Sequence, residues 1–307
     1  MSSINVDART ALEDKTLMSS NEEVQKGSSL FRTTLRKFYR HKLAMVGTFI
    51  FGLLCLMVIF APLIAPYDPN AIVGTFNAGP SPEHLLGTDQ MGRDVLSRLI
   101  FASRISLAVG LGSVAIYIII GTIVGAVAGY FGGWVDMVIN RFIDVFMSFP
   151  YLMVILVLVT IIGPGLLNIM LVLGILGWPY VARLVRASIL SIKEQDYVKA
   201  GVALGYRSPR IIFHHILPNT IAPILVNATF GAASAIIAES SLSFLGMGVQ
   251  PPSASWGNML TTAQSITALT NQPWLWIPPG IMIVLAVLSI NFIGDGVRDA
   301  LDPKSFK

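Results

Sequence analysis

The sequence has little charge and almost no cysteine, and each shortage excludes a class of protein. Charged residues make up 12% of the 307 residues, whereas hydrophobic residues make up 54% and the mean hydropathy is +0.70. A soluble globular domain carries about 25% charged residues. The one cysteine, Cys55, excludes an internal disulfide framework and a zinc cluster built on cysteines. We expect Cys55 to be a small apolar filler.

Motifs that would let the chain use chemical energy directly are also missing. No stretch matches the phosphate-binding loop G-x-x-x-x-G-K-[ST], and neither H-E-x-x-H nor G-x-S-x-G occurs. His214 and His215 are adjacent, so they lie on different faces of a helix, and we expect them at a helix end rather than in a metal site. The chain is therefore predicted to bind no cofactor or metal itself and not to be an enzyme.

The apolar residues fall in long runs, which predict helices that cross a membrane. Such a helix needs about 20 mostly apolar residues. We find six candidates: 43–65, 105–127, 135–162, 166–182, 216–237 and 274–293. The polar N-terminus has no short apolar core followed by a cleavage site, so the first run is a retained span rather than a signal peptide. The predicted fold class is all-α, a polytopic membrane protein with six transmembrane helices.

Positive charge is distributed unequally between the two sides of this arrangement. Only three of the 21 Lys and Arg residues, Arg93, Arg98 and Arg104, fall on the side opposite the N-terminus. Because Lys and Arg gather in cytoplasmic segments, we expect the N-terminus, the C-terminus and the segment 183–210 in the cytoplasm. The net charge of +4 follows from this bias and gives no reason to propose nucleic acid as a partner.

The segments outside the spans complete the expected organisation. Residues 1–42 form a cytoplasmic tail, disordered over 1–28 and then a basic amphipathic helix in the inner headgroup layer of the lipid bilayer. Two long segments, 66–103 and 242–273, lie on the outer side. Their length favours a docking or gating role over plain connectors.

The helical core is expected at 104–300, followed by a short cytoplasmic C-terminus at 301–307. In the second span, Gly121, Gly125 and Gly129 recur every four residues. Small residues at this spacing let helix backbones approach closely. The pattern predicts that this face packs against another span.

Charged residues inside the spans lie near their ends. Arg141 and Asp144 are spaced i, i+3 in the third span, which favours a structural ion pair near the inner boundary. Glu239 lies at the outer end of the fifth span, where a lone carboxylate can cap a helix, form a pair or contribute to an outer gate. No span carries a charge at its centre, which argues against proton coupling through this chain.

The largest feature on the expected cytoplasmic side is the run QDYVKAGVALGYRSPRIIFHHILPN at 195–219. Residues 194–204 are predicted to form a short helix with a small apolar face that includes Val198 and Val202. Gly205 would end this helix as a glycine cap. A helix of this kind can seat in a groove on another protein, and we favour that role over an ordinary loop.

This run resembles the cytoplasmic coupling motif of permease subunits of bacterial binding-protein-dependent ABC importers, E-A-A-x-x-x-G followed by I-x-L-P. Lys199, Ala200 and Gly201 stand at the Glu-Ala-Ala positions, and Gly205 is the glycine of the motif. Leu217 and Pro218 match the final Leu-Pro of I-x-L-P. Lys199 and Gly201 depart from the motif, so a salt bridge through its Glu is absent. Glycine in a helix interior also costs about 1 kcal/mol relative to alanine.

Further stretches extend the resemblance over most of residues 30–303. They are LGTDQMGRDVLSRLIFASRISL, AGYFGGWVDMVINRFIDVFMSFP, ESSLSFLGMGVQPPSASWGNML and GDGVRDALDP. All are similar to signatures of the C-type permease subunit of dipeptide and oligopeptide importers. The resemblance implies the type I ABC importer permease fold, a multi-pass protein of the bacterial cell membrane, and a role in peptide uptake.

The resemblance also implies an assembly. The chain would pair with a second homologous permease and with two cytoplasmic ATPases that hold ATP and Mg, while an extracytoplasmic lipoprotein captures the peptide. Movement of the ATPases would pass through a coupling helix near 194–206, where Asp196 and Tyr206 are further contact residues. Two alternatives remain open: a related importer for nickel or glutathione, which shares every motif, and an independent secondary transporter or channel.

Overall fold

The structure is a computed structural model that describes residues 30–301, with side chains from residue 34 onward. The predicted disorder of residues 1–28 and nearly all of the predicted C-terminal segment lie outside this range. Within the range the chain folds into helices and loops. The one β pairing among these residues is an isolated bridge between Thr88 and Asp94.

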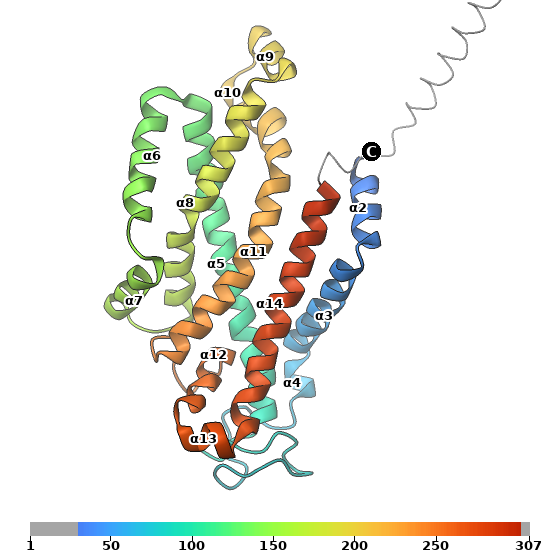
Figure 1. The fold of residues 1–307 in the computed structure, drawn as a ribbon, viewed down its shortest axis with the longest axis vertical. Coiled ribbons are helices and arrows are strands. Elements are labelled where there is room, and N and C mark those ends of the chain that lie inside the picture. Colours follow the sequence, from blue (N-terminus) through green and yellow to red (C-terminus); the bar gives the residue numbers. More distant parts are fainter. Residues whose placement is uncertain (1–29, 302–307) are drawn as a thin grey trace, which may run out of the picture.

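Five helical segments are long and apolar enough to cross a membrane, and they run along the long axis of the molecule (Figure 1). They are α3 (Lys42–Ile59), α5 (Val95–Phe131), α8 (Leu166–Lys193), a rod at Ser208–Phe244, and α14 (Pro273–Leu301). The rod consists of α10 (Ser208–Arg210), the π-helix η1 (Ile211–Ile216) and α11 (Leu217–Phe244). The structure thus has the all-helical character that the apolar runs predict.

The third predicted span, 135–162, is not one straight helix. It divides into α6 (Gly133–Met147) and α7 (Tyr151–Ile162), which are bent by 83° and are long enough for a sixth crossing only together. The break contains Pro150, which has no backbone N–H and keeps the preceding residue out of the helical region. Hydropathy alone could not detect the bend, because apolar residues continue on both sides of it.

Helix α5 begins at Val95, well before the predicted start of the second span at 105. Asp94 precedes it in extended backbone, and its carboxylate accepts hydrogen bonds from the backbone N–H and the hydroxyl of Ser97, at 2.8 and 2.7 Å. The other oxygen of Asp94 lies 3.0 Å from Nδ1 of His84. This buried cap starts the helix outside the apolar run.

The predicted fourth and first spans also have different ends in the structure. Helix α8 continues past 182 to Lys193, because a helix satisfies its own backbone hydrogen bonds whether or not its residues are apolar. The first span ends at Ile59, and the single turn α4 (Ala61–Ile64) follows Phe60. The predicted outer segment 242–273 contains three short helices: α12 (Trp256–Met259), η2 (Leu260–Gln264) and α13 (Ile266–Asn271).

The most extensive helix contact in the bundle joins α5 to α8. A Cβ atom at Gly125 would lie 2.5 Å from the carbonyl oxygen of Ala182, and one at Gly121 would lie 2.8 Å from that of Trp178. Gly129 faces the next turn of α8 in the same way. The glycine stripe therefore lies on the α5 face that meets α8, and it brings the two backbones together.

The remaining helices pack around this pair. Helix α11 contacts α5, α8 and α14, while α14 lies between α11 and α3. The amphipathic helix α2 (Leu30–Arg40) packs on the end of α14, where a Cβ at Gly296 would lie 3.1 Å from the ring of Phe38. Its predicted place at a lipid headgroup layer stays a prediction.

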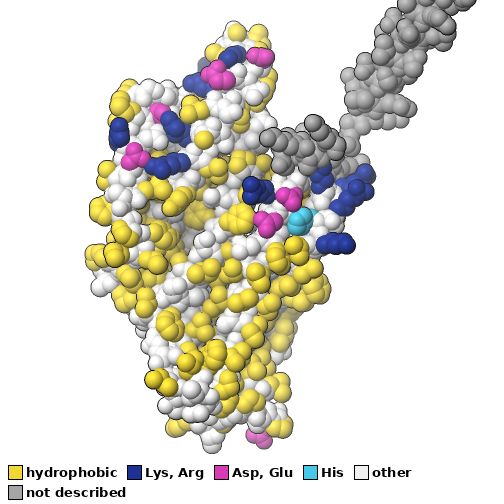
Figure 2. Space-filling view, in the orientation of Figure 1, with side chains coloured by type: hydrophobic (Ala, Val, Ile, Leu, Met, Phe, Trp, Pro, Cys, Tyr) yellow, Lys and Arg dark blue, Asp and Glu magenta, His cyan; other side chains and the backbone are white. Residues whose placement is uncertain are grey.

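The surface is divided into zones along the long axis. On the face in Figure 2, Lys and Arg side chains gather at the end that holds α2 and α9 (Asp196–Ala203). Hydrophobic side chains cover the middle, and large ones such as Phe49 and Ile161 are 68% and 75% exposed. An apolar belt of this kind suits contact with lipid chains or with other membrane helices.

We predict that Gly125→Ala destabilises the bundle, because its added methyl group would overlap the backbone of α8. Overpacking of a well-packed contact costs about 1–3 kcal/mol, so the melting temperature of the purified protein in detergent should fall by several degrees. Gly52→Ala in α3 is the matched control, since a Cβ there meets nothing within 4 Å. An equal melting temperature for the two variants would contradict the role of the stripe.

Candidate functional site

The short helix α9 lies between two long helical segments, at the end of the molecule where Lys and Arg gather (Figure 1). Gln195 precedes it in extended backbone, and Gly205 follows it with a φ of +76°. The N–H of Tyr206 donates to the carbonyl of Gly201 and that of Gly205 to Val202, both at 3.0 Å. This pair of bonds is a Schellman motif, which needs the left-handed conformation that glycine adopts without strain.

Aromatic contacts hold α9 against the start of the α11 rod. The ring of Tyr206 stacks on His215, with centroids 6.0 Å apart, and the guanidinium of Arg210 lies 4.4 Å from the same ring. A Cβ at Gly201 would lie 3.3 Å from the Tyr206 ring, so glycine at this position leaves room for the aromatic side chain. The departure from alanine in the coupling motif therefore has a packing reason.

One part of α9 is buried and another part is exposed. Val198 is 2% exposed and Gly201 is also buried, whereas Val202 is 57% and Leu204 73% exposed. The predicted apolar face containing both valines is therefore divided, because Val202 lies one turn further along and extends past the neighbouring elements. Tyr197 is also exposed, and we call these three apolar residues, Tyr197, Val202 and Leu204, the α9 tip.

Lys199 and Glu194 form an exposed ion pair, with Nζ and Oε2 2.9 Å apart. The Lys199 ammonium lowers the pKa of the Glu194 carboxyl by a hydrogen bond and by its charge. Lys199 therefore contacts its own chain in the place where the coupling motif has an acidic residue. Asp196 and Ala200 are exposed beside this pair.

Leu217 and Pro218 begin α11, directly after the π-helix η1. The Leu217 N–H still donates to the Ile212 carbonyl of η1, whereas Pro218 has no N–H to donate within this continuous rod. The side-chain amide of the next residue, Asn219, donates to the Tyr197 hydroxyl at 3.3 Å and to the His215 carbonyl at 2.7 Å. Leu217 and Pro218 thus lie where the α11 rod is joined to α9.

Two ion pairs, Arg183 with Asp144 and Arg186 with Asp136, join α8 to α6, and a third pair lies within α6. Arg141 lies 3.8 Å from Asp144 and is highly exposed, while Arg183 of α8 makes a shorter bond to the same carboxylate. About two turns of α6 away from Asp144, Arg186 of α8 binds Asp136 through two nitrogens. The i, i+3 spacing pointed to the weaker partner, because the stronger partners come from a helix that is distant in sequence.

Glu239 is fully buried near the end of α11, opposite the α9 end. The Ser243 hydroxyl donates to Oε1 of Glu239 at 2.7 Å, and the hydroxyls of Ser106 and Ser255 also hydrogen-bond this carboxylate. The Trp256 N–H donates to Ser106 Oγ at 3.1 Å. Glu239 therefore joins α11, α5 and the segment before α12, while its role in gating stays a prediction.

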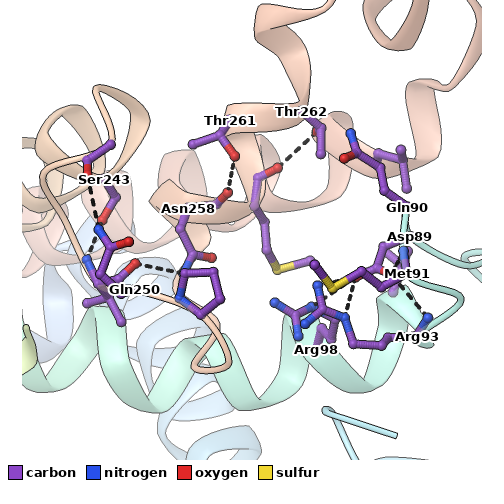
Figure 3. A pocket seen from close by; sticks show the side chains of 16 residues that line it. Asp89, Gln90, Met91, Arg93, Arg98, Ser243, Gln250, Asn258, Thr261 and Thr262 are labelled. Atoms are coloured by element: carbon purple, nitrogen blue, oxygen red, sulfur yellow. Dashed lines mark hydrogen bonds and ion pairs between the residues drawn. The ribbon is translucent and has the colours of Figure 1, made fainter. Parts of the chain in front are cut away.

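A polar cavity of about 310 Å³ lies at the same end, between the start of α5 and the segment after α11. Figure 3 shows Asp89, Arg93 and Arg98 on one side of it and Gln250 and Asn258 on the other. Both arginines contact Asp89 Oδ2, at 2.8 Å from Arg93 Nη2 and 3.4 Å from Arg98 Nε. Asp89 and Arg93 belong to the LGTDQMGRD stretch and Arg98 to the first turn of α5, so the cluster fastens the loop to the start of this helix.

Two further cavities form a groove along α11. One, of about 570 Å³, is lined by residues of α8, α11 and the end of α14, including Arg298. The other, of about 310 Å³, is lined by α5, α7, α8 and α11, and we call it the Tyr117 cavity. Asn227 and Phe230 line both cavities. The groove therefore runs from the α9 end of the bundle to the middle of its spans.

No motif in the sequence marked the residues that line this groove. A usable signal was present in α5, where Ser113 and Tyr117 place hydroxyls one turn apart within an apolar run. Such hydroxyls are common in membrane helices, where they bond the preceding turn or another helix. In the described part of the chain, no cluster of three or more His, Cys, Asp or Glu side chains is placed to hold a metal ion.

Two family models match this chain. Residues 120–307 match the family described as "Binding-protein-dependent transport system inner membrane component". Residues 29–80 match the one described as "N-terminal TM domain of oligopeptide transport permease C". The two matches together include α3, α9 and α11, whereas Ser113 and Tyr117 of the Tyr117 cavity lie outside both matched ranges.

Similar proteins come from bacteria. The dipeptide transport system permease protein DppC of Alkalihalophilus pseudofirmus is 42% identical over 90% of each chain. The oligopeptide transport system permease protein OppC of Bacillus subtilis is 39% identical over 92% of this chain and 93% of its own. Among solved structures, the MetNI methionine ABC transporter in inward-facing conformations aligns with a TM-score of 0.53. That alignment covers 67% of this chain and 98% of the other at 18% identity, so it shows the fold alone.

We predict that Glu239→Leu loosens the segment 245–258, because it removes the acceptor of buried serine hydroxyls. Each unpaired buried group costs about 1–3 kcal/mol, so amide hydrogen exchange in this segment should rise about fivefold or more. Glu239→Gln keeps the size and one acceptor oxygen, and it should have a smaller effect. Unchanged exchange in the Glu239→Leu protein would show that the carboxylate does not hold this segment.

Proposed function

The chain belongs to the family of binding-protein-dependent transport system inner membrane components, and from this membership we propose its place in an uptake system. It is a multi-pass protein of the bacterial cytoplasmic membrane and a permease subunit of an ABC importer. The family resemblance carried by the coupling run and the other stretches is confirmed. We propose di- and oligopeptides as the cargo, because relatives at about 40% identity over nine-tenths of the chain carry those names.

The observation that carries the proposal is the placement of α9 between α8 and the α11 rod, with its exposed apolar tip. A short helix that exposes Tyr197 and Val202, with Leu204 exposed at its end, can present apolar side chains to the walls of a groove on another protein. The Lys and Arg side chains at this end support a cytoplasmic location. We therefore propose that the α9 tip docks on an ATPase subunit that holds ATP and Mg.

The contacts of α9 provide a route for movement into the membrane. Tyr206 joins it to His215 and Arg210, and Tyr197 joins it to Asn219 at the start of α11. On its other side, Glu194 continues directly from α8. A displacement of α9 would therefore act on α8 and α11 together, which are helices that line the groove.

The full assembly would contain a second permease, two ATPases and an external peptide-binding lipoprotein. Family membership supports partners of these kinds. The chain itself would be non-catalytic: it would form part of the pathway, while ATP hydrolysis would occur on the ATPase subunits. With the α9 end in the cytoplasm, the polar cavity at Asp89 and the segment around α12 would face the binding protein.

We predict that Gly205→Val uncouples ATP hydrolysis from peptide uptake. A β-branched side chain at a φ of +76° strains the turn by about 1–2 kcal/mol, which would shift the position of the α9 tip. Uptake of a tripeptide per ATP hydrolysed should fall by roughly fivefold or more, with a normal amount of protein in the membrane. Both rates are measured on the complete importer in proteoliposomes.

Gly132→Val is the matched control for this experiment. Gly132 has a φ of +64° and open space around it, and it lies between α5 and α6 at the same end of the molecule. The control is strained at least as strongly, because its ψ of −156° lies in a region that is open essentially only to glycine, but it should keep its uptake per ATP. Normal coupling in Gly205→Val would exclude the proposed role of α9. Uptake by this chain alone, driven by an ion gradient, would establish an independent transporter instead.

A further inference from the structure

The Tyr117 cavity contains two buried hydroxyls that have no hydrogen-bond partner among the described residues. They are Ser113 Oγ and the Tyr117 hydroxyl, one turn apart on α5. The two side chains are 0% and 7% exposed, and both line the cavity. Buried polar groups in folded proteins nearly always have a partner, so two orphan hydroxyls on residues that line one cavity point to a ligand that supplies the missing bonds.

The position of Tyr117 is prepared by glycines on two other helices. A Cβ at Gly177 of α8 would lie 2.8 Å from the Tyr117 ring, and one at Gly231 of α11 would lie 1.4 Å from its hydroxyl oxygen. Any larger residue at either position would exclude the tyrosine from this place. Three helices are therefore shaped to hold the hydroxyl beside the cavity.

The lining of the cavity is mostly apolar, with several polar side chains and no charged one. Besides Ser113 and Tyr117 it includes Tyr151, Tyr180, Asn227 and Ser234, with apolar surface between them. A hydroxyl can both donate and accept a hydrogen bond, as the alternating N–H and C=O groups of a peptide main chain require. Without a Lys, Arg, Asp or Glu in the lining, the cavity has no group that would select for the charge of a peptide side chain.

The cavity also adjoins the second cavity of the groove. Ser113 is halfway along α5, and Asn227 and Phe230 stand between the Tyr117 cavity and the cavity that reaches the α9 end, so a movement of these two side chains would join them. Towards the other end, the buried side chains of Ile236 and Glu239 follow along α11. A peptide in the groove could therefore reach the two hydroxyls from the α9 end.

We propose that Ser113 and Tyr117 bind the main chain of the transported peptide inside the membrane. This site rests on the proposed transport function and adds to it a contact that does not depend on the peptide's side chains. The hydroxyls exchange hydrogen bonds with peptide amides, and the tyrosine rings pack against the rest of the peptide. The chain would thus contact its cargo directly, in addition to passing on the movement of the ATPases.

Disulfide trapping in the complete importer tests this site. The chain first carries Cys55→Ala and then either Ser113→Cys or Thr122→Cys. Thr122 is the matched control, since its hydroxyl is also buried on α5 without a partner among the described residues but lies outside the cavity lining. The probe is Ala-Cys-Ala with its thiol activated as a thiopyridyl disulfide, added during ATP-driven uptake.

We expect peptide to attach to the Ser113→Cys chain about tenfold faster than to the Thr122→Cys chain, because a bound peptide has a high effective concentration at its site. Mass spectrometry of this chain gives the two rates. Equal rates, or attachment at neither position while tri-alanine uptake proceeds, would overturn the site and leave the transport function standing. An unmodified assembly that takes up no peptide with ATP would overturn both.

Tyr117→Phe provides a second measurement, which does not depend on an introduced thiol. It removes one hydroxyl and keeps the ring, and uptake of tri-alanine should fall about fivefold. The same factor is expected for Ala-Asp-Ala and Ala-Lys-Ala, because the contact is to the main chain. Unchanged uptake of all three would overturn the role of Tyr117, and a loss confined to one charge type would overturn main-chain recognition.

Discussion

The close contact between α5 and α8 is the constraint on which the rest of this structure depends. Lipid chains are as apolar as leucine, so membrane helices gain little from meeting unless their backbones come close. Gly121, Gly125 and Gly129 allow that approach over three turns, and α11 packs across the pair. Where the stripe ends, Tyr117 occupies space left by glycines on the facing helices, so the helix that packs most closely also borders the central cavity.

The two ends of the bundle differ in how they are built. At the α9 end, stacked rings and an exposed apolar tip join a short helix to two long ones, and the groove opens toward this end. At the opposite end, Glu239 and several serines form a buried network, and Arg93 and Arg98 converge on Asp89. One end can thus transmit movement into the spans, while the other holds its loops in fixed positions.

Local patterns predicted the parts of the fold that depend on local composition. Apolar runs predicted the spans, and Gly205 was correctly expected to end the short helix, because a left-handed glycine terminates a helix wherever it occurs. The bend at Pro150 was missed, since hydropathy carries no information on direction. Arg183 was not identified as the partner of Asp144, because the two residues are 39 positions apart and meet only when α6 folds back on α8.

The sequence by itself determined that this protein folds in a lipid membrane, that its Lys and Arg residues gather on one side of the membrane, and to which family it belongs. Each of these follows from composition or from short contiguous motifs. The tertiary structure alone decided which polar groups lack a partner. Ser113 and Tyr117 are ordinary hydroxyl residues in the sequence, and they form a site only because Gly177 and Gly231, from two other helices, leave space beside them. Hydrogen-bond satisfaction depends on residues that are distant along the chain, so it cannot be derived from a local pattern.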